Sequence, residues 1–193
     1  MLNLNYRNWL NLVLFQSLWF AAVLGRESLL WLLVLLLTAH VLFCSDRKTE
    51  LKVMLLCAGL GSAVDIVLTL AGIFVFSPPP TVLPIPIWLI ALWLGFAATL
   101  RHSLSYLLKR PAIAIPAAGL TAPLSYFAAM RLGAVDFGFD TPFTLILLGV
   151  LWAAMMAVFI LICRARHQRR PRQGQPPFTR RTAVAKPALY PRG

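Results

Sequence analysis

The chain has 193 residues, of which 60% are hydrophobic and 12% are charged, and its mean hydropathy is +0.78. This composition excludes an ordinary soluble globular domain and indicates a polytopic membrane protein. The net charge of +12 suggests a nucleic-acid partner, but nine of the eighteen Lys and Arg residues lie beyond Cys163. No basic stripe interleaved with aromatic residues occurs elsewhere, so we expect no nucleic-acid partner and look for a membrane explanation of the charge.

The first apolar run covers residues 9–25 and is short but long enough to span a bilayer. A cleaved signal peptide is the alternative, but the next apolar run begins at Leu29 with no exported domain between the two. A tight turn at residues 25–28, with Ser28 as N-cap, is predicted to lead into a second helix over residues 29–43. His40 lies near the end of that helix.

A charged turn at residues 45–50 precedes a third helix, which is predicted over residues 51–76. Small and polar residues recur in this helix at spacings of three and four and form one face; they are Gly61, Ser62, Asp65, Thr69 and Gly72. A membrane helix uses such a face to pack closely against other helices rather than against lipid. Asp65 is therefore expected to point inward.

A stiff, proline-rich loop follows over residues 77–84, and Pro86 is predicted to start the fourth helix, where its missing N–H costs little. This helix is expected to continue without a break to Arg110. The prediction puts Arg101 and His102 inside a membrane helix, where a charge costs several kcal/mol unless it is paired, hydrated or able to reach the headgroups. An arginine and a histidine at that depth therefore suggest a functional site.

The fifth helix is predicted over residues 111–132 and should be kinked at its two internal prolines. A polar loop containing Asp136 and Asp140 then precedes a sixth helix over residues 143–163. Asp140 or Thr141 is the expected N-cap of that helix, with Pro142 in its first turn.

The predicted fold is thus an all-α integral membrane protein, with residues 1–163 forming a bundle of about six transmembrane helices. This arrangement places sixteen Lys and Arg residues on one side and only Arg26 and Arg131 on the other. Without residues 164–193 the split is still seven to two. The positive-inside rule therefore predicts that both termini are cytoplasmic and that residues 78–84 and 136–140 are external.

Residues 164–193 are basic and rich in Pro and Arg, and they lack the apolar content to fold alone. We expect a disordered cytoplasmic tail that binds anionic lipid headgroups, with about 1 kcal/mol from each basic residue near the membrane. Binding to an acidic partner or to nucleic acid is the alternative for this segment.

Any chemistry has to come from polar residues inside the membrane, because the signatures of soluble enzymes are absent. Cys44, Cys57 and Cys163 show no metal-ligand spacing and are expected to be packing residues, so we predict no metal and no cofactor. The candidate residues of an intramembrane polar site are Gln16, His40, Asp65, Thr99, Arg101, His102, Ser103, Ser125 and Tyr126.

These candidates are expected in two layers, given a rise of about 1.5 Å per helical residue. The inner layer holds Gln16, His40, Arg101 and His102, and the layer past the midplane holds Asp65, Ser125 and Tyr126. Within this arrangement we predict that Arg101 pairs with Asp65, the alternative being that Arg101 reaches the inner headgroups. For both histidines the alternative to a functional role is a hydrogen-bonded packing residue, and for Tyr126 it is an interhelical hydrogen bond.

Several short motifs resemble the bacterial membrane-protein family DUF2878, a domain of unknown function; they are Pro86-Ile87-Trp88, Leu92-Trp93, His102-Ser103-Leu104 and Pro123-Leu124-Ser125-Tyr126. Gly61, Asp65 and Gly72 also fit the pattern, and the resemblance extends over about residues 8–163. The resemblance implies a multi-pass protein of the bacterial inner membrane, and the family has no established activity. Its genes often lie near enzymes that modify membrane fatty acids, so the resemblance implies a role connected with envelope lipids.

Three functions are therefore considered. The first is an accessory or scaffold component in membrane-lipid modification or envelope stress, with a lipid-modifying enzyme as its expected partner. The second is a small transporter or flippase-like protein that uses the polar interior around Asp65. The third is an intramembrane enzyme that acts on a lipid, with His102 as base and Asp65 or Tyr126 as the orienting group.

Overall fold

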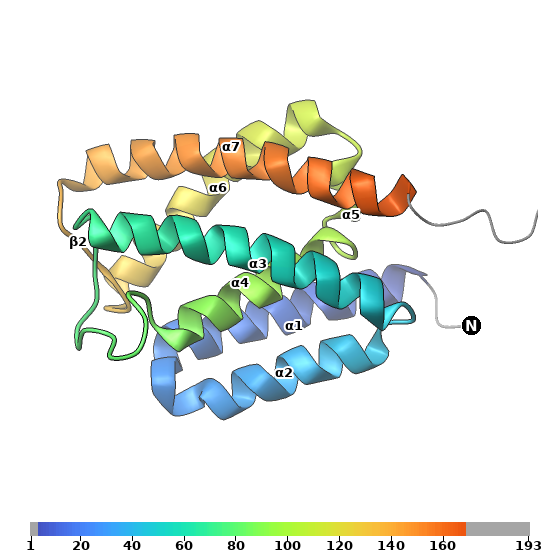
Figure 1. Cartoon of the computed structure of the whole chain (residues 1–193), viewed down its shortest axis with the longest axis horizontal. Coiled ribbons are helices and arrows are strands. Elements are labelled where there is room, and N and C mark those ends of the chain that lie inside the picture. Colours follow the sequence, from blue (N-terminus) through green and yellow to red (C-terminus); the bar gives the residue numbers. More distant parts are fainter. Residues whose placement is uncertain (1–3, 169–193) are drawn as a thin grey trace, which may run out of the picture.

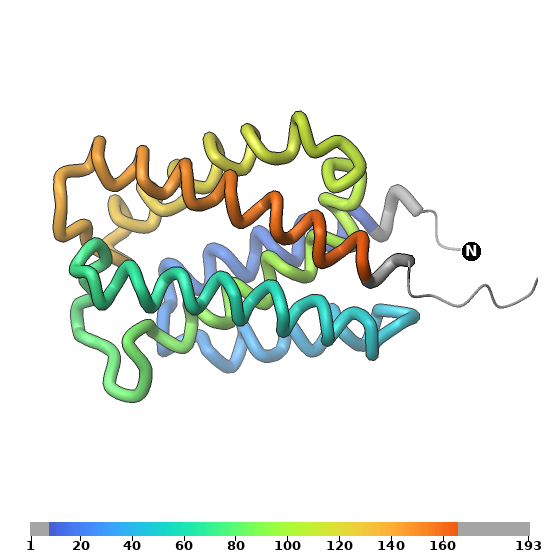
Figure 2. Tube along the Cα trace, turned by 45° about the horizontal axis from the view of Figure 1, so that its top comes forward, coloured from blue at the N-terminus to red at the C-terminus, as the bar shows by residue number. Residues whose placement is uncertain are grey.

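The computed structural model describes the backbone of residues 4–168 and the side chains of residues 8–165. The side chain of Arg7 and nearly all of the predicted tail lie outside this described part. The helices are α1 (Leu4–Gly25), the 3-10 turn η1 (Arg26–Leu29), α2 (Leu30–Phe43), α3 (Arg47–Leu70), α4 (Ile87–Leu100), α5 (Ser105–Leu108), α6 (Pro111–Arg131) and α7 (Thr141–Gln168). The long helices run along one common axis, and α1 begins at the same end of the bundle at which α7 ends (Figures 1 and 2). The predicted all-α fold is confirmed.

The apolar helices make the chain a membrane protein. Four helical segments are long and apolar enough to cross a bilayer: Asn8–Phe43, Arg47–Leu70, Pro111–Arg131 and Thr141–Ala165. The first of these comprises α1, η1 and α2, which fold back on each other as a hairpin (Figure 1). Helix α4 is equally apolar but has 14 residues, a length of about 21 Å against about 30 Å for the hydrocarbon core.

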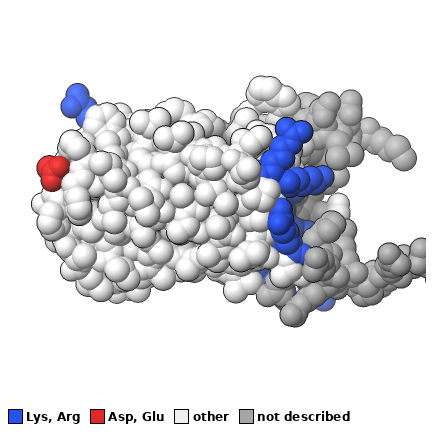
Figure 3. Space-filling model, turned by 90° about the horizontal axis from the view of Figure 1, so that it is seen from above, with Lys and Arg blue, Asp and Glu red and all other residues white. Residues whose placement is uncertain are grey.

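Charge is distributed unevenly along the bundle axis. Lys and Arg side chains gather at one end, and the broad band between the two ends shows none on the face in Figure 3. Arg47 and Lys48 lie in the first turn of α3, and Lys109 and Arg110 lie between α5 and α6. Large apolar side chains such as Leu120 lie exposed along the helices. An uncharged, apolar band of this kind is expected of a surface that faces lipid.

Helix α3 differs from its prediction at both ends. It begins at Arg47, because Asp46 Oδ1 accepts a hydrogen bond from the Thr49 backbone N–H at 3.3 Å and caps the helix within the charged turn. It ends at Leu70 rather than at Phe76, because Gly72 adopts the left-handed conformation with φ of 73°.

The chain that follows Gly72 forms the two-residue strand β1 (Phe74–Val75), which pairs antiparallel with β2 (Asp136–Phe137). In this pairing Phe74 lies opposite Phe137. The short sheet therefore ties the segment after α3 to the segment before α7, and the predicted polar loop at residues 136–140 is partly a strand.

The predicted continuous fourth helix is wrong, because α4 ends at Leu100. The carbonyl of Thr99 accepts hydrogen bonds from the backbone N–H groups of His102 and Leu104, at 3.1 and 2.9 Å, which closes a turn. The N–H of Ser103 donates to the side-chain oxygen of Asn11 at 3.3 Å instead of continuing a helix. Arg101 and His102 therefore lie in a turn between α4 and α5.

Two predicted caps have different outcomes. Ser28 is not an N-cap, since it lies inside η1 and its hydroxyl donates to the carbonyl of Gly25, while α2 begins at Leu30. Asp140 caps α7 as predicted, because its Oδ2 accepts a hydrogen bond from the Phe143 N–H at 3.2 Å.

Helices α6 and α7 pack with their backbones close together. A Cβ atom built on Gly119 would lie 3.0 Å from the carbonyl oxygen of Gly149, and a Cβ on Gly149 would lie 2.9 Å from the carbonyl oxygen of Gly119. Small residues permit this approach, as is common between membrane helices. Helix α6 continues through its two internal prolines, Pro116 and Pro123.

Candidate functional site

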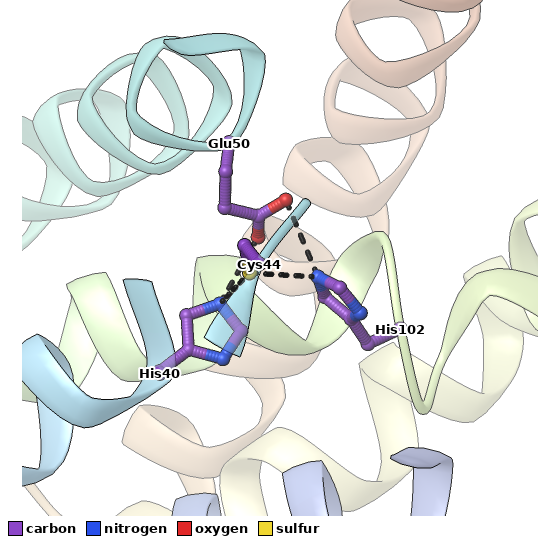
Figure 4. A group of neighbouring side chains, drawn as sticks. All are labelled: His40, Cys44, Glu50 and His102. Atoms are coloured by element: carbon purple, nitrogen blue, oxygen red, sulfur yellow. Dashed lines mark hydrogen bonds and ion pairs between the residues drawn. The ribbon is translucent and has the colours of Figure 1, made fainter. Parts of the chain in front are cut away.

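A group of charged and polar side chains meets at the basic end of the bundle; we call His40, Cys44, Glu50, Arg101 and His102 the Glu50 cluster. His40 lies in the last turn of α2 and Cys44 directly follows that helix. Glu50 lies in the first turn of α3, and Arg101 and His102 lie in the turn after α4. Figure 4 shows the side chains of both histidines, Cys44 and Glu50 pointing toward one another from these three parts of the chain.

Glu50 is the centre of the cluster and is 1% exposed. Its Oε1 lies 3.2 Å from His40 Nε2, and its Oε2 lies 2.8 Å from Arg101 Nη1 and 3.3 Å from His102 Nε2. Cys44 Sγ lies 3.5 Å from the Nε2 atom of each histidine. A buried carboxylate that accepts from several charged or polar donors satisfies the requirement that buried charges be paired.

Asn11 on α1 contacts residues of the Glu50 cluster and the turn beside it. Its side-chain oxygen accepts hydrogen bonds from Ser103, from the hydroxyl at 2.7 Å and from the N–H at 3.3 Å. Its side-chain nitrogen lies 3.3 Å from His40 Nδ1 and donates to the carbonyl of Ala98 at 3.4 Å. Asn11 thus joins α1 to α2 and to the turn after α4, which holds His40 and His102 in place.

A second polar group, which we call the Asp65 cluster, consists of Asp65, Trp93 and Tyr126. Asp65 is 1% exposed and accepts a hydrogen bond from Trp93 Nε1 at 2.6 Å. The Tyr126 hydroxyl lies 3.0 and 3.2 Å from the two carboxylate oxygens. Among residues 8–165 no ion pair to Asp65 is present, so two uncharged donors satisfy this carboxyl group.

Trp93 can reach Asp65 because of Gly61, which lies one turn before Asp65 on α3. A Cβ atom at residue 61 would overlap the indole ring of Trp93. The ring also stacks on Trp152 of α7, with centroids 4.9 Å apart and planes 13° apart. The small face predicted on α3 therefore receives a large aromatic side chain of α4 rather than a helix backbone.

Trp93 and Tyr126 of the Asp65 cluster form part of the wall of a cavity with a volume of about 530 Å³. We call it the aromatic cavity; it lies between α1, α4, α6 and α7, and its lining includes Phe15, Trp19, Phe96, Ala118, Ala122 and Tyr126. The lining is almost entirely apolar, with polar atoms from residues such as Gln16 and Ser125. Cavities of 300–1,000 Å³ that are mostly apolar, with a few polar groups, are typical of sites for small molecules.

A hydrogen bond joins α1 and α6, two of the helices that flank the cavity. Trp19 Nε1 on α1 donates to the hydroxyl of Ser125 on α6 at 2.9 Å. Both residues line the aromatic cavity. This contact therefore connects α1 and α6 across one side of it.

The structure brings some of the predicted site residues together and separates others. His40, Arg101 and His102, which were predicted in one inner layer, lie together in the Glu50 cluster. Gln16, predicted in the same layer, lines the aromatic cavity instead. Tyr126 reaches Asp65, and Ser103 holds Asn11. The Thr99 hydroxyl donates to the carbonyl of Phe96 in its own helix, at 2.6 Å.

The predicted pair of Asp65 and Arg101 is wrong. Arg101 pairs with Glu50, and Asp65 is bound by Trp93 and Tyr126. The end of α4 at Leu100 is the physical reason, because Arg101 then follows the turn toward the start of α3 rather than the helix toward Asp65. His102 likewise contacts Glu50 and Cys44. It does not belong to the cluster of Asp65 and Tyr126, which the enzyme hypothesis names as its orienting groups.

Sequence reasoning missed three residues of these sites. Glu50 was assigned to an exposed charged turn, and Cys44 to packing. The available signal was the four-residue spacing of His40 and Cys44, followed six residues later by Glu50 in the first turn of α3. Trp93 is part of a motif that resembles the family, but it is not among the candidate site residues, although it lies on α4 with the candidate Thr99.

Comparison with known proteins places the chain in a family without an established activity. No curated protein and no solved structure gave a match to this chain. A family described as a protein of unknown function, DUF2878, matches residues 8–158, which is most of the chain and includes both polar clusters and the aromatic cavity. The chain therefore belongs to the DUF2878 family.

Proposed function

We propose that this protein binds the acyl chain of a membrane lipid in the aromatic cavity and serves as an accessory component of membrane-lipid modification in the bacterial inner membrane. The observation that supports this proposal best is the cavity itself, a mostly apolar space of about 530 Å³ inside a bundle whose outer surface faces lipid. An apolar cavity in a membrane protein is most readily filled by the hydrocarbon that surrounds it.

The lining favours a chain-like ligand over a polar solute. Aromatic rings form one part of the cavity wall. The small side chains of α6 on another part, including Ala118 and Ala122, leave space for a ligand. A transported polar solute would require several convergent polar groups, whereas Gln16 and Ser125 are among only a few here. Asp65 does not line the cavity and contributes by holding the rings of Trp93 and Tyr126 that do.

The contact between Trp19 and Ser125 supplies a route of entry in this proposal. Separation of α1 from α6 at this hydrogen bond widens the side of the cavity where the lining residues Gln16 and Leu124 are exposed, so that a lipid enters from the membrane without crossing water. The hydrogen bond itself contributes about 1 kcal/mol to holding the two helices together.

The test is to measure lipid bound to the full-length protein after purification in a mild detergent, by native mass spectrometry. Ala122→Trp fills the cavity and should abolish lipid binding. Leu120→Trp is the matched control, because Leu120 lies on the same helix but is 72% exposed, and it should retain bound lipid. Equal lipid binding by the wild type and both variants would contradict the proposal.

The accessory role is tested separately by lipid analysis of a strain that lacks the gene. Loss of one modified lipid species, with restoration by the wild type and not by Ala122→Trp, would support the role. Unchanged lipids together with altered uptake of a solute would favour the transporter alternative instead.

A further inference from the structure

We propose that the Glu50 cluster is a metal site in which His40, Cys44, Glu50 and His102 bind one zinc ion and fasten the ends of three helices. The ligand atoms of these four residues all lie within 4.8 Å of one another. The inference is independent of lipid binding, because the aromatic cavity is lined by other residues.

The spacing of the ligand atoms fits tetrahedral zinc. With bonds to nitrogen and oxygen of about 2.1 Å and to sulfur of about 2.3 Å, a tetrahedral site places N and O ligands about 3.4 Å apart and S and N ligands about 3.6 Å apart. The corresponding separations are 3.2 Å from Glu50 Oε1 to His40 Nε2 and 3.5 Å from Cys44 Sγ to the Nε2 atom of each histidine, while His102 Nε2 lies 3.3 Å from the other carboxylate oxygen, Oε2. The four ligand atoms all lie within 4.8 Å of one another, so a central ion must draw the wider pairs closer together.

Cys44 distinguishes a metal site from a hydrogen-bonded network. A thiol is a weak hydrogen-bond donor and acceptor, so hydrogen bonding alone gives little reason for Cys44 Sγ to approach two imidazole nitrogens. A thiolate, two imidazoles and a carboxylate are a ligand set that suits zinc. The carboxylate and the thiolate also neutralise the charge of a divalent ion, and Arg101 remains bound to Glu50 Oε2 while Oε1 faces His40.

Asn11 provides support outside the ligands. When zinc binds Nε2 of His40, the proton of the ring lies on Nδ1 and needs an acceptor. The amide of Asn11, whose nitrogen is 3.3 Å from Nδ1, meets this need by turning end for end. In the turned position its oxygen accepts from Nδ1, and its nitrogen donates to the Ser103 hydroxyl at the position where the oxygen now lies 2.7 Å away. In the turned position the amide nitrogen faces the Ser103 N–H and the amide oxygen faces the Ala98 carbonyl, so these two contacts, at 3.3 and 3.4 Å, become unfavourable and are the cost of this arrangement.

Four protein ligands leave no open position, which is the arrangement of a structural rather than a catalytic zinc site. The ligands come from the last turn of α2, the residue after it, the first turn of α3 and the turn after α4. The ion would therefore fix the end of the bundle where Lys and Arg side chains gather (Figure 3).

The experiment measures metal in the full-length protein, purified in mild detergent from cells supplied with zinc. Elemental analysis is expected to give about one zinc per chain. After chelation and addition of Co²⁺, the wild type should show the absorption of a cobalt–thiolate bond. Cys44→Ser should remove that absorption, and His102→Gln should reduce bound zinc to background. Asn11→Leu should weaken zinc binding by about 10–100-fold without removing the site.

Cys57→Ser is the matched control, because Cys57 of α3 is buried, as Cys44 is, but is not among the four ligands. It should keep the zinc and the cobalt absorption. Far-UV circular dichroism and gel filtration check that each variant is folded. Folded wild-type protein that retains no zinc and gives no cobalt–thiolate absorption would overturn the proposal. Cobalt–thiolate absorption that persists in Cys44→Ser would overturn it as well.

Discussion

Arg101 donates a hydrogen bond to Glu50 at 2.8 Å and so joins the turn after α4 to the first turn of α3. The Glu50 side chain is 2% exposed and that of Arg101 is 26% exposed, so the pair lies at the edge of the buried interior. Glu50 also faces both histidines. The pair is therefore one part of a network that holds three helices together at the basic end of the bundle.

The first prediction concerns this pair. Arg101→Gln leaves the buried carboxylate with fewer donors and is expected to lower the free energy of unfolding by about 3 kcal/mol, the low end for buried pairs because Arg101 is partly exposed. The double variant Glu50→Gln, Arg101→Gln should recover part of that loss. The measurement is a double-mutant cycle by unfolding in mixed micelles, with a chelator present throughout so that metal binding does not contribute.

The control for this cycle is the combination of Asp65→Asn with Arg101→Gln. Because Asp65 contacts Trp93 and Tyr126 instead, the two losses should add to within about 0.5 kcal/mol. Additive losses for Glu50 and Arg101, or strong coupling of Asp65 to Arg101, would contradict the structure.

The partner of Arg101 could not be found from the sequence, because the depth of each residue was counted along a helix assumed to be continuous. After the break at Leu100 the Ser103 N–H is accepted by Asn11, which lies 92 residues before Ser103. A local pattern does not contain such a contact. Glu50 was missed for a related reason, since its burial follows from the approach of α2 and of the turn after α4 and not from its own polar surroundings.

Other features followed from the sequence because their causes are local. The apolar runs gave the long helices, and the cap at Asp140 gave the start of α7. The small face of α3 correctly indicated that Asp65 is buried. The predicted end of α3 was wrong because hydropathy does not distinguish a helix from the apolar strand β1, and the left-handed conformation of Gly72 separates the two elements.

The second prediction concerns the Asp65 cluster. Asp65→Leu leaves Trp93 Nε1 and the Tyr126 hydroxyl without their acceptor, and the expected loss in the free energy of unfolding is about 1–3 kcal/mol. Because both rings line the aromatic cavity, lipid retention should fall as well. The measurements are unfolding in mixed micelles and native mass spectrometry. Unchanged stability together with unchanged lipid binding would show that the carboxyl group does not position the rings.

The third prediction compares two glycines of α3. Gly61→Val places methyl groups where the Trp93 ring lies, so the ring must move and the stacking on Trp152 should be lost. The expected cost is about 1–3 kcal/mol, as for overpacking in other cores. Gly59→Val is the matched control, because nothing lies within 4 Å of a Cβ atom at residue 59. Tryptophan fluorescence and unfolding should change for Gly61→Val only, and equal effects would contradict the packing of Trp93 on α3.

The last prediction concerns topology. Single cysteines at Thr81 and at Lys109, in a protein whose Cys44, Cys57 and Cys163 are replaced by serine, should be labelled by a membrane-impermeant maleimide from opposite sides. Both positions are exposed. Lys109 lies between α5 and α6, at the end of the bundle where α7 ends (Figure 1), and the basic side chains gather at that end, so the positive-inside rule places Lys109 in the cytoplasm and Thr81 outside. Labelling in intact spheroplasts should therefore reach Thr81→Cys only, and Lys109→Cys should react only after the membrane is opened. Labelling of Thr81→Cys from the cytoplasmic side alone would reverse the orientation, and labelling of both positions in intact spheroplasts would show that the helices between them do not separate the two ends of the bundle.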